Sequence, residues 1–212
     1  MGQRLNGARI SALPEPSRRV SIDDFYLDYL PRLWRALWPS PEAAAWRLRM
    51  GVEIAATHYT LTIDGADLQA VAQAADDLPL TLRLDRESWR TAVHDLLPRL
   101  LRYAKKHPAT LADALMPMQK SVNHAALIDA LTAEPGVVSL HFTDDAGDSA
   151  LYEFHIASGA GPRAEIYADD GDLWHALEAS GKAARLATTK IRLAGDTGYL
   201  TRLIETARKH LR

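Results

Sequence analysis

The chain has 212 residues, of which 47% are hydrophobic and 25% charged, and its formal net charge is −2. These are the values of an ordinary globular protein with a sizeable core, and the near-neutral charge argues against nucleic-acid binding by bulk electrostatics. The absence of cysteine excludes disulfides, zinc–thiolate sites, iron–sulfur clusters and thiol catalysis. No apolar run approaches the ~20 residues of a membrane-spanning helix and no secretory signal is recognisable, so we expect a cytoplasmic protein.

Three segments are expected along the chain. Residues 1–19 are interpreted as a flexible arm, because prolines and arginines leave no regular period there. Residues 20–120 are expected to form an N-terminal helical and α/β half, and residues 121–212 a C-terminal α/β half. The fold class that follows is α/β (α+β), with a mixed, largely antiparallel sheet covered by amphipathic helices.

The N-terminal half should open with an amphipathic helix that Ser21 caps, with Asp24 three residues further on. Pro31 interrupts its apolar stripe and predicts a kink or a junction of two helices. The stripe consists of Ile22, Phe25, Tyr26, Tyr29, Leu30, Leu33, Trp34 and Leu37. Four members are expected to be buried against the rest of the chain or a second copy: Phe25, Tyr29, Leu33 and Trp34.

The remainder of the first half mixes helices and strands. A helix is predicted from Glu42 to Met50, and a strand over His58–Ile63. Residues 68–75 fit a helix by their alanine content or a strand by their position between two strands. Leu80–Leu84 alternates as a half-buried strand, and the helix that follows should break near Pro98.

The second half begins with a predicted helix over Val122–Ala133. Three alternating segments follow, at residues 138–142, 152–156 and 163–167, and turn residues separate them. This order predicts a β-meander, and therefore an antiparallel sheet.

The last fifty residues continue with a short helix that contains Trp174, a strand over Lys190–Leu193, a Gly195-Asp196 turn and a closing helix, Thr197–Leu211. The closing helix has one continuous apolar face. That face consists of Tyr199, Leu200, Leu203, Ile204, Ala207 and Leu211.

One pattern occurs in both halves. A strand ending near Ile63 or Ile156 is followed by another strand, acidic cap residues and a helix with one tryptophan, Trp89 or Trp174. Because the gaps differ, this is not a strict repeat. Either both halves are related modules and the first has lost or altered its closing strand, or the first half is an unrelated cover; we favour two related halves.

No constellation of catalytic or metal-binding residues is visible in the sequence. None of the eight histidines pairs with another at helical spacing, and there is no nucleophile-elbow motif. His141 and His155 lie on two strands of one predicted hairpin and could face each other, but two surface histidines are the simpler interpretation. We therefore expect no metal, no cofactor and no enzymatic activity.

The order of elements in the C-terminal half resembles the sterol carrier protein (type 2) family. The matching sequence motifs are Leu173-Trp174-His175-Ala176-Leu177 and Lys190-Ile191-Arg192-Leu193-Ala194-Gly195-Asp196. The resemblance implies a non-enzymatic carrier of a fatty acyl chain, sterol or other lipid in an apolar cavity between sheet and helices. Its expected ligand-binding residues are Phe154, Ile156, Trp174, Leu177, Ile191, Tyr199, Leu200, Leu203 and Ile204.

The alternative from another class is an accessory or interaction module with a filled core. Such a module would dock a partner protein, or a second copy as a homodimer, through the N-terminal aromatic helices. Tryptophans and apolar helix faces serve packing and ligand cavities equally well, so the pattern alone does not separate the two. A lipid that co-purifies with the protein would favour the carrier.

Overall fold

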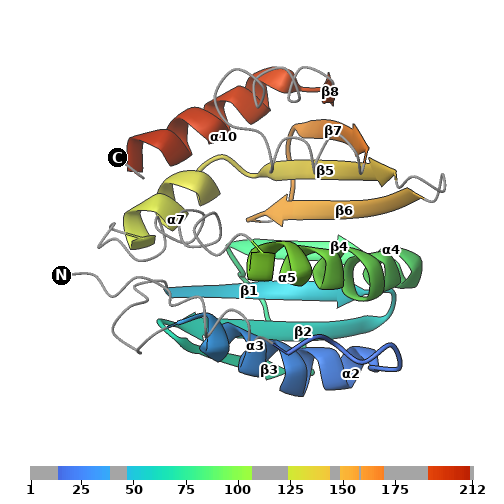
Figure 1. The fold of residues 1–212 in the computed structure, drawn as a ribbon. Helices are drawn as coiled ribbons and strands as arrows, with labels where there is room; N and C mark the ends of the chain where they lie inside the picture. The colour runs from blue at the N-terminus through green and yellow to red at the C-terminus, as the bar shows by residue number, and fades with distance from the viewer. Residues whose placement is uncertain are drawn as a thin grey trace.

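The computed structural model describes residues 14–38, 47–106, 124–143, 149–157, 159–169 and 191–210. The strands are β1 (Arg47–Ile54), β2 (Thr57–Asp64), β3 (Asp67–Val71), β4 (Leu80–Leu84), β5 (Gly136–Thr143), β6 (Ser149–Ile156), β7 (Arg163–Asp169) and β8 (Arg192–Gly195). They form one eight-stranded sheet in the order β3-β2-β1-β4-β6-β5-β7-β8 (Figure 1). Two neighbouring pairs, β1/β4 and β5/β7, are parallel and the others are antiparallel. The α+β class and the mixed, largely antiparallel sheet are thus confirmed.

The helices pack on one face of this sheet, because the apolar residues alternate along the strands. In the β1/β2 pair, Leu48 lies opposite Ile63 and Val52 opposite Tyr59 on the helix-facing side. On the opposite face no described helix packs, and this face, called the helix-free face for the described part of the chain, carries polar residues such as Glu53 on β1. The described helical segments are α2 (Ile22–Asp24), η1 (Phe25–Tyr29), α3 (Leu30–Leu37), α4 (Arg86–Arg90), η3 (Thr91–Leu96), α5 (Leu97–Lys106), α7 (His124–Thr132) and α10 (Thr197–His210).

The first helical stretch, α2–η1–α3, contains a π-helical turn directly before Pro31. Proline has no N–H to donate to the preceding turn, and the wider turn accommodates that loss without ending the helix. Ser21 caps the stretch, since its hydroxyl accepts a hydrogen bond of 3.0 Å from the Asp24 N–H. The α4–η3–α5 stretch repeats this arrangement, with a π-helical turn directly before the segment that contains Pro98.

The N-terminal aromatic stripe forms part of the main core. Phe25, Tyr29 and Leu33 are each no more than 6% exposed, while Trp34 is half-buried and donates its Nε1–H to the Gly65 carbonyl over 3.0 Å. Phe25 contacts Tyr26, Tyr29 and Trp89, and Tyr26 stacks on Tyr59. The predicted burial is confirmed for Phe25, Tyr29 and Leu33 and holds in part for Trp34.

Two expectations for the first half concern strands. The predicted helix over Glu42–Met50 is wrong for Arg47–Met50, which belong to β1; residues 42–46 lie outside the described part of the chain. The physical reason is a period of two, Leu48, Met50, Val52 and Ile54, that runs through this segment. Of the two alternatives for residues 68–75, the strand is correct for the residues up to Val71, at the end of β3.

The expected β-meander is wrong, because β7 pairs in parallel with β5 and not with β6. The connection from β6 to β7 passes around the start of β5, where the Val137 N–H donates to the Pro162 carbonyl over 3.0 Å. Gly161 has a φ of 141°, and a Cβ there would lie 2.5 Å from the Pro135 carbonyl oxygen. The free side of β6 pairs instead with β4.

The first half (described residues 14–38 and 47–106) and the second half (described residues 124–143, 149–157, 159–169 and 191–210) share one strand arrangement. In the first, a β1/β2 hairpin is followed by β4, parallel to β1; in the second, a β5/β6 hairpin is followed by β7, parallel to β5. The three strands of the second half therefore repeat those of the first, displaced by three places in the sheet. In this comparison β4 corresponds to β7. Strand β7 pairs with β8 on its outer side, and β4 pairs with β6 in the equivalent position. The first half has no counterpart of β8 among its described residues, and β6 of the second half takes that place.

Candidate ligand-binding site

The helix-facing side of the sheet is packed tightly at one end of the strands and loosely at the other. On β1, Val52 and Ile54 are buried, whereas Leu48 and Met50 are only partly buried. On the antiparallel β6 the order is reversed, since Tyr152 is buried but Phe154 and Ile156 are not fully covered. The same end of β4, β5 and β7 adds further half-buried apolar residues: Leu80, Leu82, Val138, Leu140 and Ile166.

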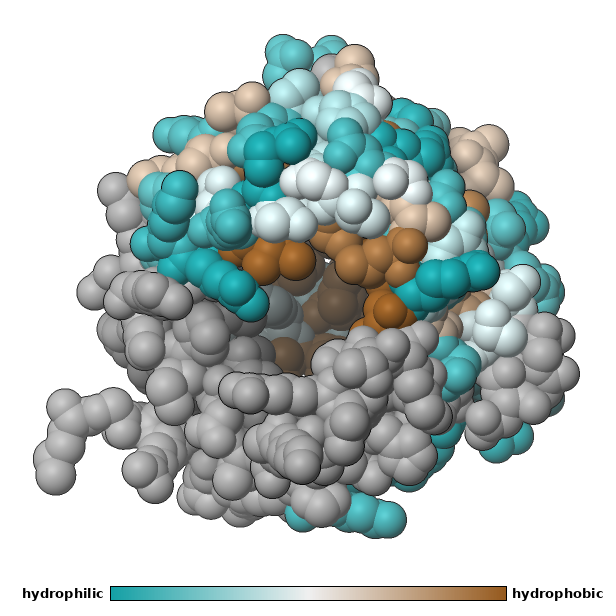
Figure 2. Space-filling model, turned by 90° about the horizontal axis from the view of Figure 1, so that it is seen from above, coloured by the Kyte–Doolittle hydropathy of each residue, from teal (hydrophilic) through white to brown (hydrophobic). Residues whose placement is uncertain are grey.

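The surface of the molecule is also hollowed at one end. Seen from the end at which α10 and β8 lie, the surface opens into a hollow with hydrophobic residues along its rim (Figure 2). Apolar side chains usually fill the space between a sheet and its helices to crystal-like density. The half-buried leucine, isoleucine and phenylalanine side chains of the strip contact the buried clusters but remain partly accessible, so the cover over them is incomplete.

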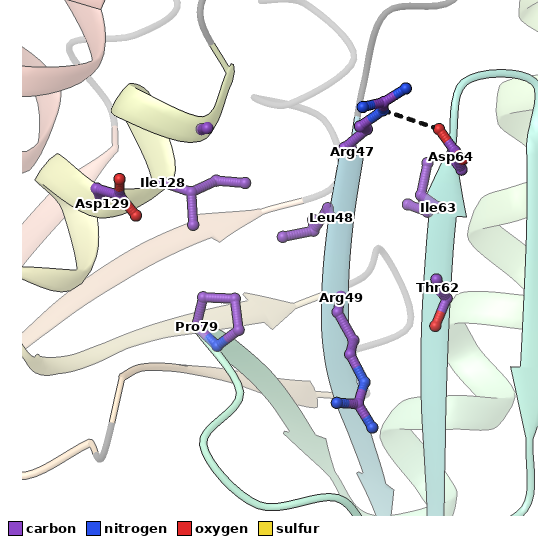
Figure 3. A pocket seen from close by; sticks show the side chains of 10 residues that line it. Arg47, Leu48, Arg49, Thr62, Ile63, Asp64, Pro79, Ile128 and Asp129 are labelled. Atoms are coloured by element: carbon purple, nitrogen blue, oxygen red, sulfur yellow. Dashed lines mark hydrogen bonds and ion pairs between the residues drawn. The ribbon is translucent and has the colours of Figure 1, made fainter.

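A cavity of about 440 Å³ lies next to the strip, between β1 and α7. It forms because β4 is short: β4 pairs with Gly51–Ile54, and among the described strands none pairs with the preceding residues of β1 on that side. Leu48 and Ile128 of α7 point toward one another across the gap, and Pro79 lies below them (Figure 3). The lining residues are Arg47, Leu48, Arg49, Thr62, Ile63, Asp64, Pro79, Ala125, Ile128 and Asp129.

The cavity has charged groups at its border. Arg47 is held by Asp64, with 3.0 Å between Nε and Oδ1. Arg49, two residues further along β1, is exposed and has no hydrogen bond or ion pair among the described residues. Asp129 lies on the α7 side. The site is therefore an apolar gap flanked by one neutralised arginine, one arginine without a partner in the described part of the chain, and one carboxylate.

The closing helix α10 covers a packed cluster instead of a cavity wall. Tyr199 is fully buried, Leu200 and Leu203 are buried against Ala164, and the Tyr199 hydroxyl donates to the Glu134 carbonyl over 3.1 Å. Asp196 caps the helix by accepting from the Tyr199 N–H at 2.8 Å. The three buried residues thus belong to the core and not to the cavity between β1 and α7.

The structure brings the other expected ligand-binding residues together only in part. Phe154 and Ile156 lie on the loosely packed sheet face, and Ile191 is half-buried directly before β8. Ile204 is 43% exposed, because the packed face of α10 runs through Leu203 and leaves its neighbour at the side. The expected wall residues Trp174 and Leu177 lie outside the described residues.

Sequence reasoning missed the lining of the cavity between β1 and α7. Leu48 and Ile63 could have been paired if the period of two through β1 had been recognised, since the short Ala55-Ala56 connection then makes β1 and β2 a hairpin. Ile128 was expected on a helix, but no sequence signal places α7 beside β1. That proximity depends on how far β4 extends.

The helix-free face carries a row of alternating charges that joins the two halves. Arg83 on β4 pairs with Glu53 at 2.5 Å, and Arg163 on β7 pairs with Glu153 on β6. Burial raises the pKa of Glu153, but the Arg163 hydrogen bond and charge outweigh it and hold that pKa below its usual value. Burial and the Arg83 charge lower the pKa of His155. His141 and His155, which the sequence placed on one predicted hairpin, do not lie opposite each other. In the strand register His141 is opposite Leu151 and His155 is opposite Val137.

Comparison with known proteins adds no identification: no protein-family model and no curated protein matches the chain. Within the described ranges, no group of three or more potential metal ligands comes together. No described helix is both long enough and apolar enough to cross a membrane.

Proposed function

We propose that the protein is a non-enzymatic binder or carrier of a hydrophobic molecule, such as a fatty acyl chain, a sterol or another lipid. The observation that carries the proposal is the half-buried apolar strip on the helix-facing side of the sheet, next to a cavity of about 440 Å³. That volume lies in the range of ~300–1,000 Å³ typical of small-molecule pockets.

The mechanism requires only desolvation. An acyl chain or ring system that lies along Leu48, Ile128 and the sheet strip would leave water, and each buried methylene contributes about 0.8 kcal/mol. Part of this gain offsets the lost freedom of the ligand. A chain of about a dozen carbons would still be retained by apolar contact alone.

The resemblance to the sterol carrier protein (type 2) family supports the same proposal. The Gly-Asp motif that contributes to the resemblance has physical roles in this chain. Gly195 has a φ of 67°, and a Cβ at this position would lie 2.4 Å from the Arg163 carbonyl oxygen, so the site requires glycine. Asp196 then caps α10. These roles explain why the two residues end a strand and begin a helix, which is the step that carries the resemblance.

The alternative, a docking module that uses the N-terminal aromatic helices, has less support. Phe25, Tyr29 and Leu33 pack into the protein's own core and are not presented to a partner. Leu27 is the large apolar residue of that stretch that is exposed. A single exposed leucine is common on protein surfaces and does not define an interface.

The test is to look for a bound lipid. Native mass spectrometry and organic extraction of freshly purified protein should reveal a co-purified hydrophobic molecule, and delipidated protein should bind members of a panel of fatty acids, sterols and quinones. Protein without co-purified lipid that also binds no member of the panel would contradict the proposal and favour the docking module.

A further inference from the structure

The charges at the cavity between β1 and α7 indicate which hydrophobic molecules fit it. Arg47 and Arg49 flank Leu48 on β1 and border the gap from the other face of the sheet, while Leu48 points into it (Figure 3). Since Asp64 already neutralises Arg47, the guanidinium of Arg49 is the cation at this border with no partner among the described residues.

We propose that the ligand is an anionic amphiphile whose carboxylate or phosphate head group binds Arg49, while its alkyl chain lies between Leu48 and Ile128. This inference rests on the proposed function and specifies its ligand class. A guanidinium presents two parallel N–H donors that match the two oxygens of a carboxylate or phosphate, so it is suited to such a head group. A neutral alcohol offers one hydroxyl and no charge.

The opposite charge in the cavity helps to place the head group. Asp129 on α7 is exposed and would repel an anion. The head group should therefore lie on the β1 side, next to Arg49, and the chain should extend toward Pro79 and the sheet strip. An anion centred on α7 would meet Asp129 and no described lysine or arginine of that helix.

The experiment compares three ligands with the same twelve-carbon chain: dodecanoate, dodecyl phosphate and dodecanol. Displacement of a neutral fluorescent probe from the full-length protein gives each Kd. Wild-type protein should bind at least one of the two anions about tenfold more tightly than dodecanol, because a charge-assisted hydrogen bond stabilises only the anions. The ratio of the two anions separates a fatty-acid site from a phosphate-ester site.

Variants locate the effect. Arg49→Gln should weaken binding of the favoured anion about tenfold and leave dodecanol unchanged, whereas Arg49→Lys should retain part of the preference. Asp129→Asn should tighten anion binding by about two- to fivefold, as expected for removing one exposed like charge. Arg86→Gln is the matched control, since Arg86 is an exposed arginine of α4 outside the cavity lining.

The outcomes separate the two proposals. Equal binding of anions and dodecanol, or an unchanged anion preference in a folded Arg49→Gln variant, overturns the head-group inference and leaves the carrier intact. Failure of all three ligands to bind, with no co-purified lipid, overturns the carrier and the head-group inference together. Thermal unfolding of each variant shows whether a loss of binding reflects the site or the fold.

Discussion

The two halves of the molecule share a strand arrangement but fill it differently. In the first half, the aromatic side chains of α2–η1–α3 lie over the β1/β2 hairpin and pack with Tyr59 and Trp89. In the second half, α7 packs on α10, and the sheet face beside it keeps half-buried apolar residues. In the first half, the helical stretch α2–η1–α3 that precedes the hairpin fills the space above that hairpin. In the second half, the preceding helix α7 leaves open space at its side.

This difference indicates that topology alone does not decide whether a sheet-and-helix layer has a solid core or a cavity. Besides the short β4, the size of the side chains on the covering helix contributes to the outcome. Phe25, Tyr26 and Tyr29 each bring a large ring to the first half, whereas the residues α7 contributes to the cavity wall are Ala125, Ile128 and Asp129. An aromatic ring buries about 150–250 Å², far more than an alanine.

The largest effect should come from truncating the filled core. Phe25→Ala should lower the free energy of unfolding by about 3–5 kcal/mol, because the vacated space in a close-packed aromatic cluster cannot collapse. Ile166→Ala, on the loosely packed strip, should cost less than about 2 kcal/mol because its side chain is only partly removed from water. Urea unfolding measures both. Equal costs would mean that the two halves are packed alike.

A second test removes one hydroxyl from the core of the first half. Tyr59 is 1% exposed, and its hydroxyl donates a hydrogen bond to the Asp23 carboxylate, which anchors the N-terminal helix to β2. Tyr59→Phe should cost about 1.5–3 kcal/mol, the range for hydrogen bonds to charged groups. Tyr167→Phe is the control, since its hydroxyl bonds Glu165 on the helix-free face. A larger loss for Tyr167→Phe than for Tyr59→Phe would contradict this assignment.

The third test inserts tryptophan on each side of the comparison. Leu203→Trp enters the packed α10 cluster and should cost about 1–3 kcal/mol through overpacking. Ile128→Trp enters the cavity between β1 and α7, so it should cost less than about 1 kcal/mol and weaken binding of a fluorescent fatty acid. Thermal unfolding and probe titration report the two effects. If Ile128→Trp were the more destabilising variant, the cavity would not offer the space described.

The smallest expected effect concerns pH at the junction of the two halves. Because the pKa of His155 is lowered in the fold, the unfolded chain binds the proton more readily, and stability should fall as the pH decreases below about 6.5. The lowered pKa of Glu153 adds a second loss below about 4.5. His155→Gln should remove the first loss and retain the second, as measured by Tm between pH 7.5 and 4. An unchanged profile in this variant would exclude His155 as its cause.

Most of the fold could be predicted from local patterns. Alternation located β2, β4, β5, β6 and β7, the cap residue Ser21 placed the start of the first helix, and the Gly195-Asp196 turn placed the start of the closing helix. The errors were non-local. The meander failed because the pairing of β7 with β5 depends on a connection that passes around β5, and no period in the sequence records which neighbour a strand selects.

The site was less predictable for the same reason. The apolar face of α10 was identified, but an apolar face looks the same in sequence whether it meets a packed cluster or a cavity. Leu203 meets Ala164 and is buried, whereas Leu48 meets Ile128 across open space. What separates them is the five-residue length of β4, which is a property of the assembled sheet.

The short strand β8 has a consequence for self-association. Strand β7 is seven residues long, and four of them pair with β8. A chain cut after Asp169 would expose the whole outer edge of β7 as unpaired N–H and C=O groups, which are a template for joining another chain. Strand β8 and helix α10 would then protect the edge of β7 from aggregation in addition to covering the core. Truncated protein should accumulate as insoluble fibrous or amorphous material under conditions in which the full chain stays dispersed.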